Sequence, residues 1–359
     1  FNPKSEMSYL YLAKIFENKD DKENEEFNLN TVLVLNPKNE EAIYMLMNLK
    51  IKKSDFSETD KLLKRFNLVC VSLCSKADKI QKKLDNLSSN SNKTNWLMKK
   101  KITIADLKKN KKNKRPIACL TSYTKNIAEI VDKYCEIVLV GDSVGGVIYG
   151  MENTKKVTLD TMINHARSVR LGVKKSLLVV DMPYGTYLNK RSAYTNAKKI
   201  IKNSKCNAVK LEGGKKISKI IKHLVKNGIP VMGHVGLLPQ SSPNLKIQGR
   251  NNFQRKKILE DAISVSKSGA FALVIECVVE KIAKEITKTI SIPTIGIGAS
   301  KYCDGQVLVI DDLIGLSNFS PKFVKRYSNV HKIIENSVKR FCKDVRRRKF
   351  PFKSNVYEG

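Results

Sequence analysis

The sequence predicts an α/β protein, a (β/α)8 TIM barrel over residues 98–359, preceded by a small all-α extension. From residue 98 onward, apolar β-rich runs alternate with amphipathic helical stretches, and the strand-like runs number eight. None of these runs leads into the Gly-x-Gly-x-x-Gly turn that would favour a doubly wound sheet. With 359 residues, the chain is long enough for such a barrel and an appendage.

Residues 1–87 are expected to form the helical extension. They show apolar residues at helical spacing and no convincing strand. Asn2-Pro3-Lys4 recurs as Asn36-Pro37-Lys38, an offset of 34 residues. Paired helices with this period resemble the tetratricopeptide repeat, although only two units are present. The extension is therefore either a degenerate repeat fragment or a generic helical appendage.

A polar segment at residues 88–97, which begins Ser88-Ser89-Asn90, predicts a linker between the two parts. The expected strands are 116–122, 136–142, 176–182, 208–213, 230–235, 272–277, 293–297 and 306–311. The expected helices between them include 159–171, 192–204, 216–227, 256–268 and 279–290.

Five consecutive predicted strands end on a polar side chain, which apolar strands rarely tolerate. These residues are Asp142, Asp181, Glu212, His234 and Glu276. In a barrel, the C-terminal strand ends form the rim of the active site. Taken singly, each acid could cap the helix that follows, and His234 could be a core histidine. Repetition over neighbouring strands favours one shared site instead.

The two-residue period of a strand assigns these side chains to faces. Lys210 and Glu212 share one face, while Val209 and Leu211 should face the outer helices. By the same period, three acids share a face with the apolar residue two positions earlier, which should fill the barrel interior: Val140 before Asp142, Val179 before Asp181 and Val274 before Glu276.

The chemistry of this rim follows from its charges. Converging carboxylates repel one another unless a cation neutralises them, and oxygen ligands without cysteine favour Mg²⁺. A metal with open positions beside Lys210 suits a 2-oxo acid, because it can polarise the keto oxygen and stabilise an enolate. A further carboxylate could remove the proton. The residues alone thus predict enolate formation from a 2-oxo acid, with the electrophile left open.

The chain carries a net charge of +33, from 67 basic and 34 acidic side chains. Because lysines are spread over nearly every predicted helix, we expect solvated helix faces and no specific nucleic-acid partner. No apolar run is long enough to span a membrane. The eight cysteines form no CxxC pair and no zinc spacing, so reduced, buried thiols of a cytoplasmic protein are expected.

Longer motifs make the rim more specific. Their order and spacing resemble ketopantoate hydroxymethyltransferase from about Ile102 to Pro351. The motifs are Val140-Gly141-Asp142-Ser143-Val144-Gly145, Asp181-Met182-Pro183-Tyr184, Val209-Lys210-Leu211-Glu212-Gly213-Gly214, Gly233-His234-Val235-Gly236-Leu237, Leu238-Pro239-Gln240-Ser241, Gln248-Gly249-Arg250, Glu276-Cys277-Val278, Ile295-Gly296-Ile297-Gly298-Ala299 and Asp304-Gly305-Gln306. The resemblance implies a barrel of the phosphoenolpyruvate/pyruvate-binding type.

The resemblance also implies roles for individual residues. Asp142, Asp181 and Glu212 match the family's magnesium ligands. Contacts to 3-methyl-2-oxobutanoate match Asp142, Ser143, Asp181 and Lys210, with His234 as a further active-site residue. Glu276 matches the general base.

The implied reaction transfers a hydroxymethyl group from 5,10-methylenetetrahydrofolate to 3-methyl-2-oxobutanoate. It gives 2-dehydropantoate and tetrahydrofolate in pantothenate and coenzyme A biosynthesis. The resemblance further implies a homo-oligomer, a decamer. Three alternatives remain open: a related magnesium-dependent 2-oxo acid lyase or aldolase, a non-catalytic repeat-bearing scaffold, and a nucleic-acid binder that uses the positive charge, whose affinity would depend strongly on salt.

Overall fold

The structure is a computed structural model of the whole chain. It describes all residues except 1–4, 54, 91–100, 243–245, 318–320 and 358–359. The chain divides into two compact units, Phe1–Met98 and Lys99–Gly359. Most of the predicted linker, residues 91–97, lies outside the described residues.

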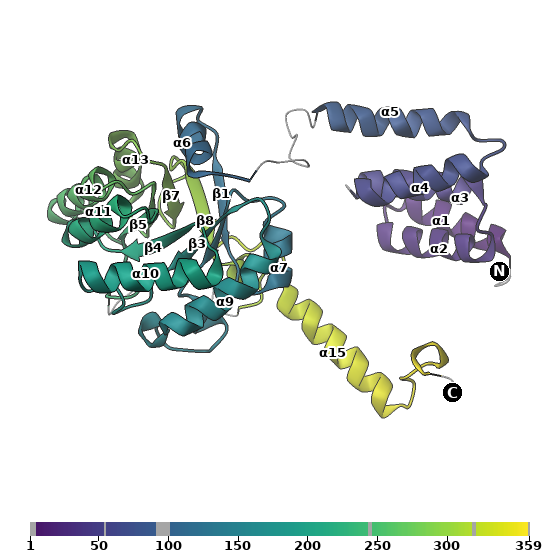
Figure 1. Ribbon diagram of the computed structural model, residues 1–359. Helices are drawn as coiled ribbons and strands as arrows, with labels where there is room; N and C mark the ends of the chain where they lie inside the picture. Colours follow the sequence, from purple (N-terminus) through teal and green to yellow (C-terminus); the bar gives the residue numbers. More distant parts are fainter. Residues whose placement is uncertain (1–4, 54, 91–100, 243–245, 318–320, 358–359) are drawn as a thin grey trace. The chain divides into compact units, whose positions relative to one another are not determined.

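The second unit is a closed barrel of eight parallel strands that pair in chain order, which confirms the predicted (β/α)8 fold (Figure 1). The strands are β1 (Ile117–Thr121), β2 (Ile137–Val140), β3 (Leu177–Asp181), β4 (Ala208–Glu212), β5 (Val231–Gly236), β6 (Ala272–Glu276), β7 (Thr294–Ile297) and β8 (Gly305–Leu308). Strand β8 was predicted to reach residue 311. It ends earlier because the Ile310 amide donates to the Thr121 hydroxyl and a short helix, α14 (Ile310–Leu313), begins there.

Helices cover the outside of the barrel (Figure 1). They are α7 (Lys125–Val131), α9 (Leu159–Gly172), α10 (Lys190–Ser204), α11 (Ser218–Lys226), α12 (Asn252–Lys267) and α13 (Glu280–Thr289), with the short α8 (Val144–Val147) after β2. Side chains of Thr158, Asn189 and Asn251 accept backbone N–H groups at the starts of α9, α10 and α12, as N-caps do. The last helix, α15 (Val330–Arg346), is fully described and buries none of its residues.

Two apolar layers hold the barrel together. Val209 and Leu211 belong to the layer between strands and helices, whereas Val179 and Val274 belong to the layer inside the barrel, as predicted. Val140 was predicted to face inward and instead packs in the outer layer. Strand β2 ends at Val140, so the strand period does not extend to Asp142.

One further helix closes the N-terminal end of the barrel. Helix α6 (Ile104–Lys112) buries Leu107 in the inner layer, beside Ile117, Ile137 and Leu177, the first residues of their strands. This plug leaves the opposite end, where the strands finish, as the open mouth.

The described residues of the first unit form five helices, α1 (Glu6–Asn18), α2 (Lys22–Leu35), α3 (Glu40–Lys52), α4 (Phe56–Val69) and α5 (Ser75–Asn90), which confirms the helical extension. The starts of α1 and α3 differ by 40 − 6 = 34 residues, and those of α2 and α4 by 56 − 22 = 34, so the sequence offset is also a structural one. Leu29, Ile43 and Phe66 lie in a core of their own. Helix α5 runs through the first three residues of the segment predicted as a linker.

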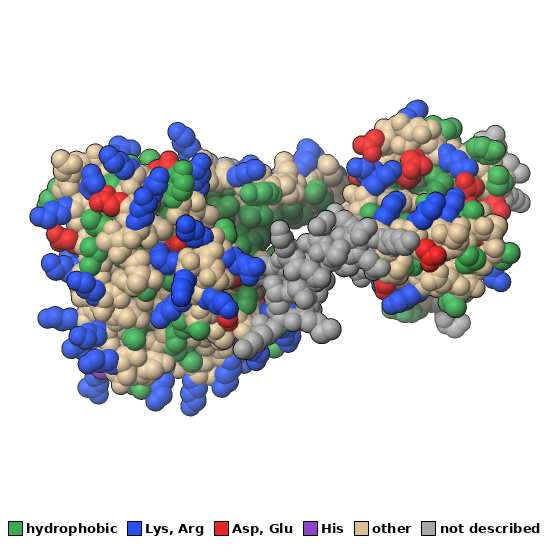
Figure 2. All heavy atoms as spheres, turned by 90° about the horizontal axis from the view of Figure 1, so that it is seen from above, with side chains coloured by type: hydrophobic (Ala, Val, Ile, Leu, Met, Phe, Trp, Pro, Cys, Tyr) green, Lys and Arg blue, Asp and Glu red, His purple; other side chains and the backbone are tan. Residues whose placement is uncertain are grey.

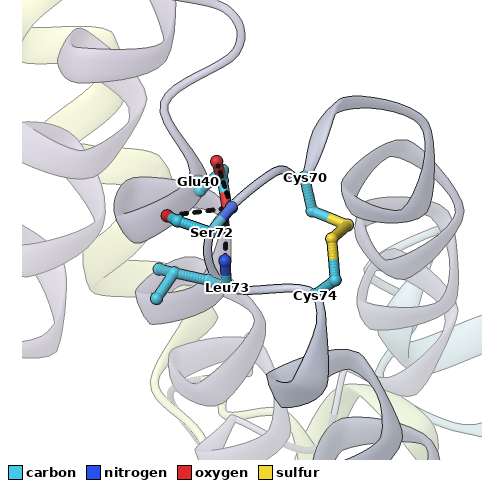
Figure 3. The surroundings of a disulfide bond; sticks show 5 residues. All are labelled: Glu40, Cys70, Ser72, Leu73 and Cys74. Atoms are coloured by element: carbon cyan, nitrogen blue, oxygen red, sulfur yellow. Dashed lines mark hydrogen bonds between the residues drawn. A yellow bond between two sulfur atoms is a disulfide. The ribbon is translucent and has the colours of Figure 1, made fainter.

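The prediction that all eight cysteines are reduced is wrong for two of them. Cys70 and Cys74 form a disulfide in the turn between α4 and α5 (Figure 3). A turn that reverses the chain brings their Cα atoms to 5.3 Å, within the range a disulfide needs, although the sequence spacing is not that of a CxxC pair. In the same turn, the Glu40 carboxylate accepts the amides of Ser72 and Leu73. The other six cysteines are free thiols.

The positive charge is distributed as the sequence indicates. Figure 2 shows lysine and arginine side chains scattered over the visible face of the barrel unit. Among the described residues, no helix is both long and apolar enough to cross a membrane.

Candidate active site

Neighbouring strands carry the predicted site residues to one end of the barrel. Asp181 is the last residue of β3 and lies in register with Lys210 on β4. Glu212, the last residue of β4, lies in register with His234 on β5. Glu276 is the last residue of β6. All of these residues except Glu276 are buried.

The side chains form one connected polar layer. Lys210 Nζ lies 3.1 Å from Asp181 Oδ1 and 3.4 Å from His234 Nδ1. The His234 ring spans two acids, with Nδ1 3.5 Å from Glu212 Oε1 and Nε2 3.2 Å from Glu276 Oε2. The imidazole therefore links Glu276 to the buried acids, a connection that the sequence did not indicate.

Asp142 and Ser143 enter this layer from the turn that follows β2. The Asp142 amide donates to Asp181 Oδ2 at 3.1 Å, which ties the two aspartates together. The Ser143 hydroxyl lies 2.7 Å from the hydroxyl of Tyr123. A Cβ atom at Gly141 would come within 2.8 Å of Ser143 Oγ, so this tight turn leaves little room for a larger residue.

Gln240 joins the cluster and was not predicted as a site residue. Its side-chain amide donates to Asp142 Oδ2 at 2.7 Å and to the Met182 carbonyl at 3.0 Å. Its carbonyl accepts the Tyr187 hydroxyl, and its backbone amide donates to Glu212 Oε2 at 3.1 Å. One residue, 2% exposed, thus contacts two of the predicted metal ligands, Asp142 through its side chain and Glu212 through its backbone amide. The sequence signal was its place in the Leu238-Pro239-Gln240-Ser241 motif.

Burial and charge shift the pKa values of these groups in different directions. Burial, and then the charges of Asp181 and Glu212, raise the pKa of Asp142 to about 7. Burial also raises the pKa of Asp181, although Lys210 opposes it. Burial raises the pKa of Glu212 too, but contacts with His234 and Lys210 outweigh it and leave a net lowering.

The two basic groups hold their protons firmly. Burial alone would lower the pKa of Lys210, yet Asp181, Glu212 and Asp142 raise it overall. Burial and Lys210 lower the pKa of His234, but Glu212 and Glu276 outweigh them and raise it to about 9. The layer therefore places a lysine and a protonated histidine among four carboxylates.

The donor chemistry of this layer fits a hard divalent cation. Asp142, Asp181 and Glu212 offer carboxylate oxygens only, and buried Asp181 Oδ1 has no hydrogen-bond donor besides its ion pair with Lys210. Burial, and then repulsion from Asp181 and Glu212, raise the pKa of Asp142, and a bound cation would favour its charged form. Within the described residues, no three acidic, His or Cys side chains already form a complete ligand set. Mg²⁺ does not need one, since it usually keeps several waters.

A large cavity opens above the polar layer. Its volume is about 1300 Å³, and Ser143 and Glu276 line it on the side of the buried acids. Apolar side chains form much of its wall, among them Val147, Met151, Leu237, Leu316 and Phe323. Glu276 therefore stands between the buried carboxylates and a space large enough for a second, bigger molecule.

A (β/α)8 barrel with a charged mouth and an adjoining cavity defines a barrel enzyme that acts on small molecules. The family model of ketopantoate hydroxymethyltransferase matches residues 101–353. The chain belongs to this family. It is 59% identical over 247 residues to a 3-methyl-2-oxobutanoate hydroxymethyltransferase of Pelagibacter ubique, covering 69% of this chain and 96% of that protein. The protein of the same name from Rhizobium etli is 49% identical over 252 residues, covering 69% and 92%.

Solved structures resemble the barrel more distantly. Phosphonopyruvate hydrolase matches with a TM-score of 0.49 and 8% identity, over 71% of this chain and 91% of that one. A 2,3-dimethylmalate lyase of the PEP mutase/isocitrate lyase superfamily matches with a TM-score of 0.45 and 9% identity, over 71% and 91%. The assignment to the family rests on sequence and the fold class on the strand order of the barrel itself.

Proposed function

We propose that the chain transfers a hydroxymethyl group from 5,10-methylenetetrahydrofolate to 3-methyl-2-oxobutanoate. One water is consumed, and the products are 2-dehydropantoate and tetrahydrofolate. The observation that supports this reaction best is the placement of Glu276. It contacts the buried acid cluster through His234 and also lines the large cavity, so one base can serve a small substrate on one side and a carrier on the other.

The buried layer would receive the oxo acid. Asp142, Asp181 and Glu212 would hold Mg²⁺, which when bound would draw charge from the keto oxygen and acidify carbon 3. Lys210, whose ammonium group already neutralises Asp181 at 3.1 Å, would meet the negative charge of the substrate carboxylate. The Ser143 hydroxyl, held by Tyr123, would donate a hydrogen bond to the same substrate.

Glu276 would take the proton from carbon 3 and leave an enolate. Carbon 3 would then bond to the one-carbon unit as that unit's bonds to N5 and N10 break, with the consumed water supplying the hydroxyl group. The proton held by Glu276 and the second proton of the water would pass to the two nitrogens. A general base must lie within hydrogen-bond reach of the proton that it removes. Glu276 contacts the buried polar layer through His234 and also lines the large cavity. His234, protonated and 3.2 Å from Glu276 Oε2, orients this carboxylate. Its other nitrogen faces Glu212, so one ring couples the base to the acid cluster.

The decisive assay follows formation of 2-dehydropantoate by the purified protein from both substrates, with and without Mg²⁺. We expect product only when 5,10-methylenetetrahydrofolate is supplied, and loss of activity with a chelator that Mg²⁺ restores. A lyase or aldolase that shares the enolate chemistry would act without folate, so cleavage of a 2-oxo acid in its absence would contradict the proposal. The decameric assembly and the cytoplasmic location remain predictions.

A further inference from the structure

Two polar atoms in the wall of the large cavity are buried and have no partner. They are Oδ2 of Asp311, on α14, and the Thr154 hydroxyl, in the loop after α8. A buried polar group without a hydrogen bond is costly, and native proteins contain few of them. Both atoms belong to residues that line one cavity, so they indicate a ligand in that cavity whose polar groups form the missing hydrogen bonds.

Asp311 differs from the other acids along this cavity. Glu276 contacts His234, Glu152 is exposed, and Asp312 is only partly buried and feels the charge of Arg326. Asp311 is 8% exposed and forms no ion pair among the described residues. The helix that carries it is fixed, because the Ile310 amide donates to Thr121 and the amides of Leu316 and Ser317 donate to the Asp311 carbonyl.

The ligand that this position suits carries adjacent N–H donors on a flat ring. A carboxylate can accept two parallel N–H groups in a fork, one on each oxygen, and Asp311 Oδ2 has no partner that competes for its place in the fork. The proposed co-substrate has such an edge, since the 2-amino group and the N3–H of its pterin ring lie side by side. The apolar side chains of Met151, Leu316 and Phe323 line the same cavity and suit the faces of a flat ring.

We infer that Asp311 is the residue that recognises the pterin ring of the folate co-substrate, through its 2-amino and N3–H groups. This inference rests on the proposed function. The edge that Asp311 would bind is remote from N5 and N10, which carry the one-carbon unit. Asp311 is thus a binding residue: its loss weakens folate binding and leaves proton removal from the oxo acid intact.

The test measures binding of tetrahydrofolate, and of its 2-desamino-2-methyl analogue, to the full chain by titration calorimetry. In Asp311→Asn, an amide N–H₂ replaces one acceptor oxygen, so we expect tetrahydrofolate to bind about 30-fold more weakly. Wild type should lose a similar factor with the analogue, whereas the variant should bind both compounds within about 3-fold, because the group that distinguished them is gone. Glu152→Gln, an exposed acid of the same cavity, should change neither affinity by more than about 2-fold.

A folate-independent measurement separates this inference from the reaction itself. Exchange of the carbon 3 hydrogen of 3-methyl-2-oxobutanoate with deuterated water should proceed in Asp311→Asn as in wild type, which also shows that the variant folds. Tetrahydrofolate binding equal to wild type, or an equal loss with the analogue in both proteins, overturns the inference. If the variant does not fold, equal affinity of wild type for tetrahydrofolate and for the analogue overturns the inference as well. Absence of 2-dehydropantoate from wild type would instead overturn the proposed function.

Discussion

Both ends of the barrel carry acidic side chains with little exposed surface, but the groups that surround these acids differ between the two ends. At the mouth, Asp142, Asp181 and Glu212 follow or finish strands and crowd together, and the pKa of Asp142 rises to about 7. At the closed end, Asp132 precedes β2 and Asp304 precedes β8. Asp132 accepts the amides of residues 174–176, at 2.7 Å from Ser176.

The difference shows what each set contributes. Burial would raise the pKa of Asp132, but the amides of residues 174–176 outweigh it and lower the pKa below its usual range. Asp304 accepts the Thr294 amide and pairs with Lys111 of the plug helix at 2.7 Å. Backbone amides and one lysine therefore hold the acids at the closed end. At the mouth, burial and then repulsion between neighbouring acids raise the pKa of Asp142, even though Lys210 and Gln240 contact the cluster. Substitutions at the mouth should therefore lower activity and change stability little, whereas substitutions at the closed end should lower stability and change activity little.

Asp181→Asn should show the largest effect at the mouth. The variant keeps the shape of the side chain but removes one charge from the proposed cation site and from Lys210, so we expect turnover to fall about 1000-fold. Its thermal unfolding should shift little, because the lost charge also relieves repulsion from Asp142. Steady-state assays with and without added Mg²⁺, together with calorimetric unfolding, measure both effects. Nearly full activity would remove Asp181 from the cation site.

Glu276→Gln should be the next largest. The amide keeps the shape of the carboxylate and its contact with His234 but cannot accept a proton, so we expect turnover to fall at least about 100-fold. Binding of Mg²⁺ and 3-methyl-2-oxobutanoate should persist. In deuterated water, wild type should exchange the carbon 3 hydrogen even without folate, and the variant should not. Undiminished exchange would show that a group other than Glu276 removes the proton.

Gln240→Met tests whether Asp142 needs the side-chain amide that donates to it. The change deletes the side-chain bonds to Asp142, Met182 and Tyr187 while keeping the volume. We expect Mg²⁺ to bind about 10- to 100-fold more weakly, as for groups that orient metal ligands, with turnover recovering at high Mg²⁺. Gln254→Met is the matched control, because Gln254 accepts only loop amides of Gly249 and Arg250. A purely structural role for Gln240 would lower stability and leave Mg²⁺ affinity unchanged.

Asp132→Asn probes the closed end and should spare catalysis. Replacing one acceptor oxygen by an amide N–H₂ leaves backbone donors of residues 174–176 unsatisfied, so we expect a loss of about 2 kcal/mol in unfolding free energy. Turnover of the folded enzyme should match wild type. Because the native pKa of Asp132 is depressed, its contribution is complete above the usual value near 3.9 and disappears as the pH falls through the native pKa. The gap between the two proteins, measured by denaturant titration, should therefore narrow below about pH 4.

The site at the mouth could be predicted from the sequence because consecutive strands end on polar residues and alternate their side chains with a period of two. Asp181, Lys210, Glu212, His234 and Glu276 stand where two-residue alternation and the barrel rule place them. Residues outside regular elements escaped this logic. Gln240 lies 98 positions from Asp142 in sequence, and only the folded loop brings them together.

Short-range changes of structure escaped it as well. Asp311 was predicted to lie in the last strand. In the structure the Ile310 amide donates to the Thr121 hydroxyl, and helix α14 begins at Ile310. Val140 faces outward because it alternates with Leu139, which lies in the inner layer. The prediction had counted the strand period back from Asp142, which lies beyond the end of β2. The Cys70–Cys74 disulfide depends on a turn whose path spacing alone does not define. The start of α14 depends on a single hydrogen bond and the disulfide on a chain reversal, and periodicity detects neither.

Removal of residues 1–97 should have the smallest effect of all. The predicted site residues lie between Asp142 and Glu276, and the chain divides into compact units at Met98 and Lys99. The first unit has its own apolar core, with Leu29, Ile43 and Phe66 fully buried and no barrel residue in that cluster. A chain of residues 98–359 keeps α6, whose Leu107 closes the barrel, and should therefore fold. We expect its turnover at saturating Mg²⁺ to agree with the full chain within about 2-fold, since no contact of the active-site cluster is removed.

A shorter chain that begins after α6, at residue 114, supplies the contrast, because it exposes the inner layer and should lose stability. Failure of the 98–359 chain to fold would show that the helical unit covers a surface the barrel needs.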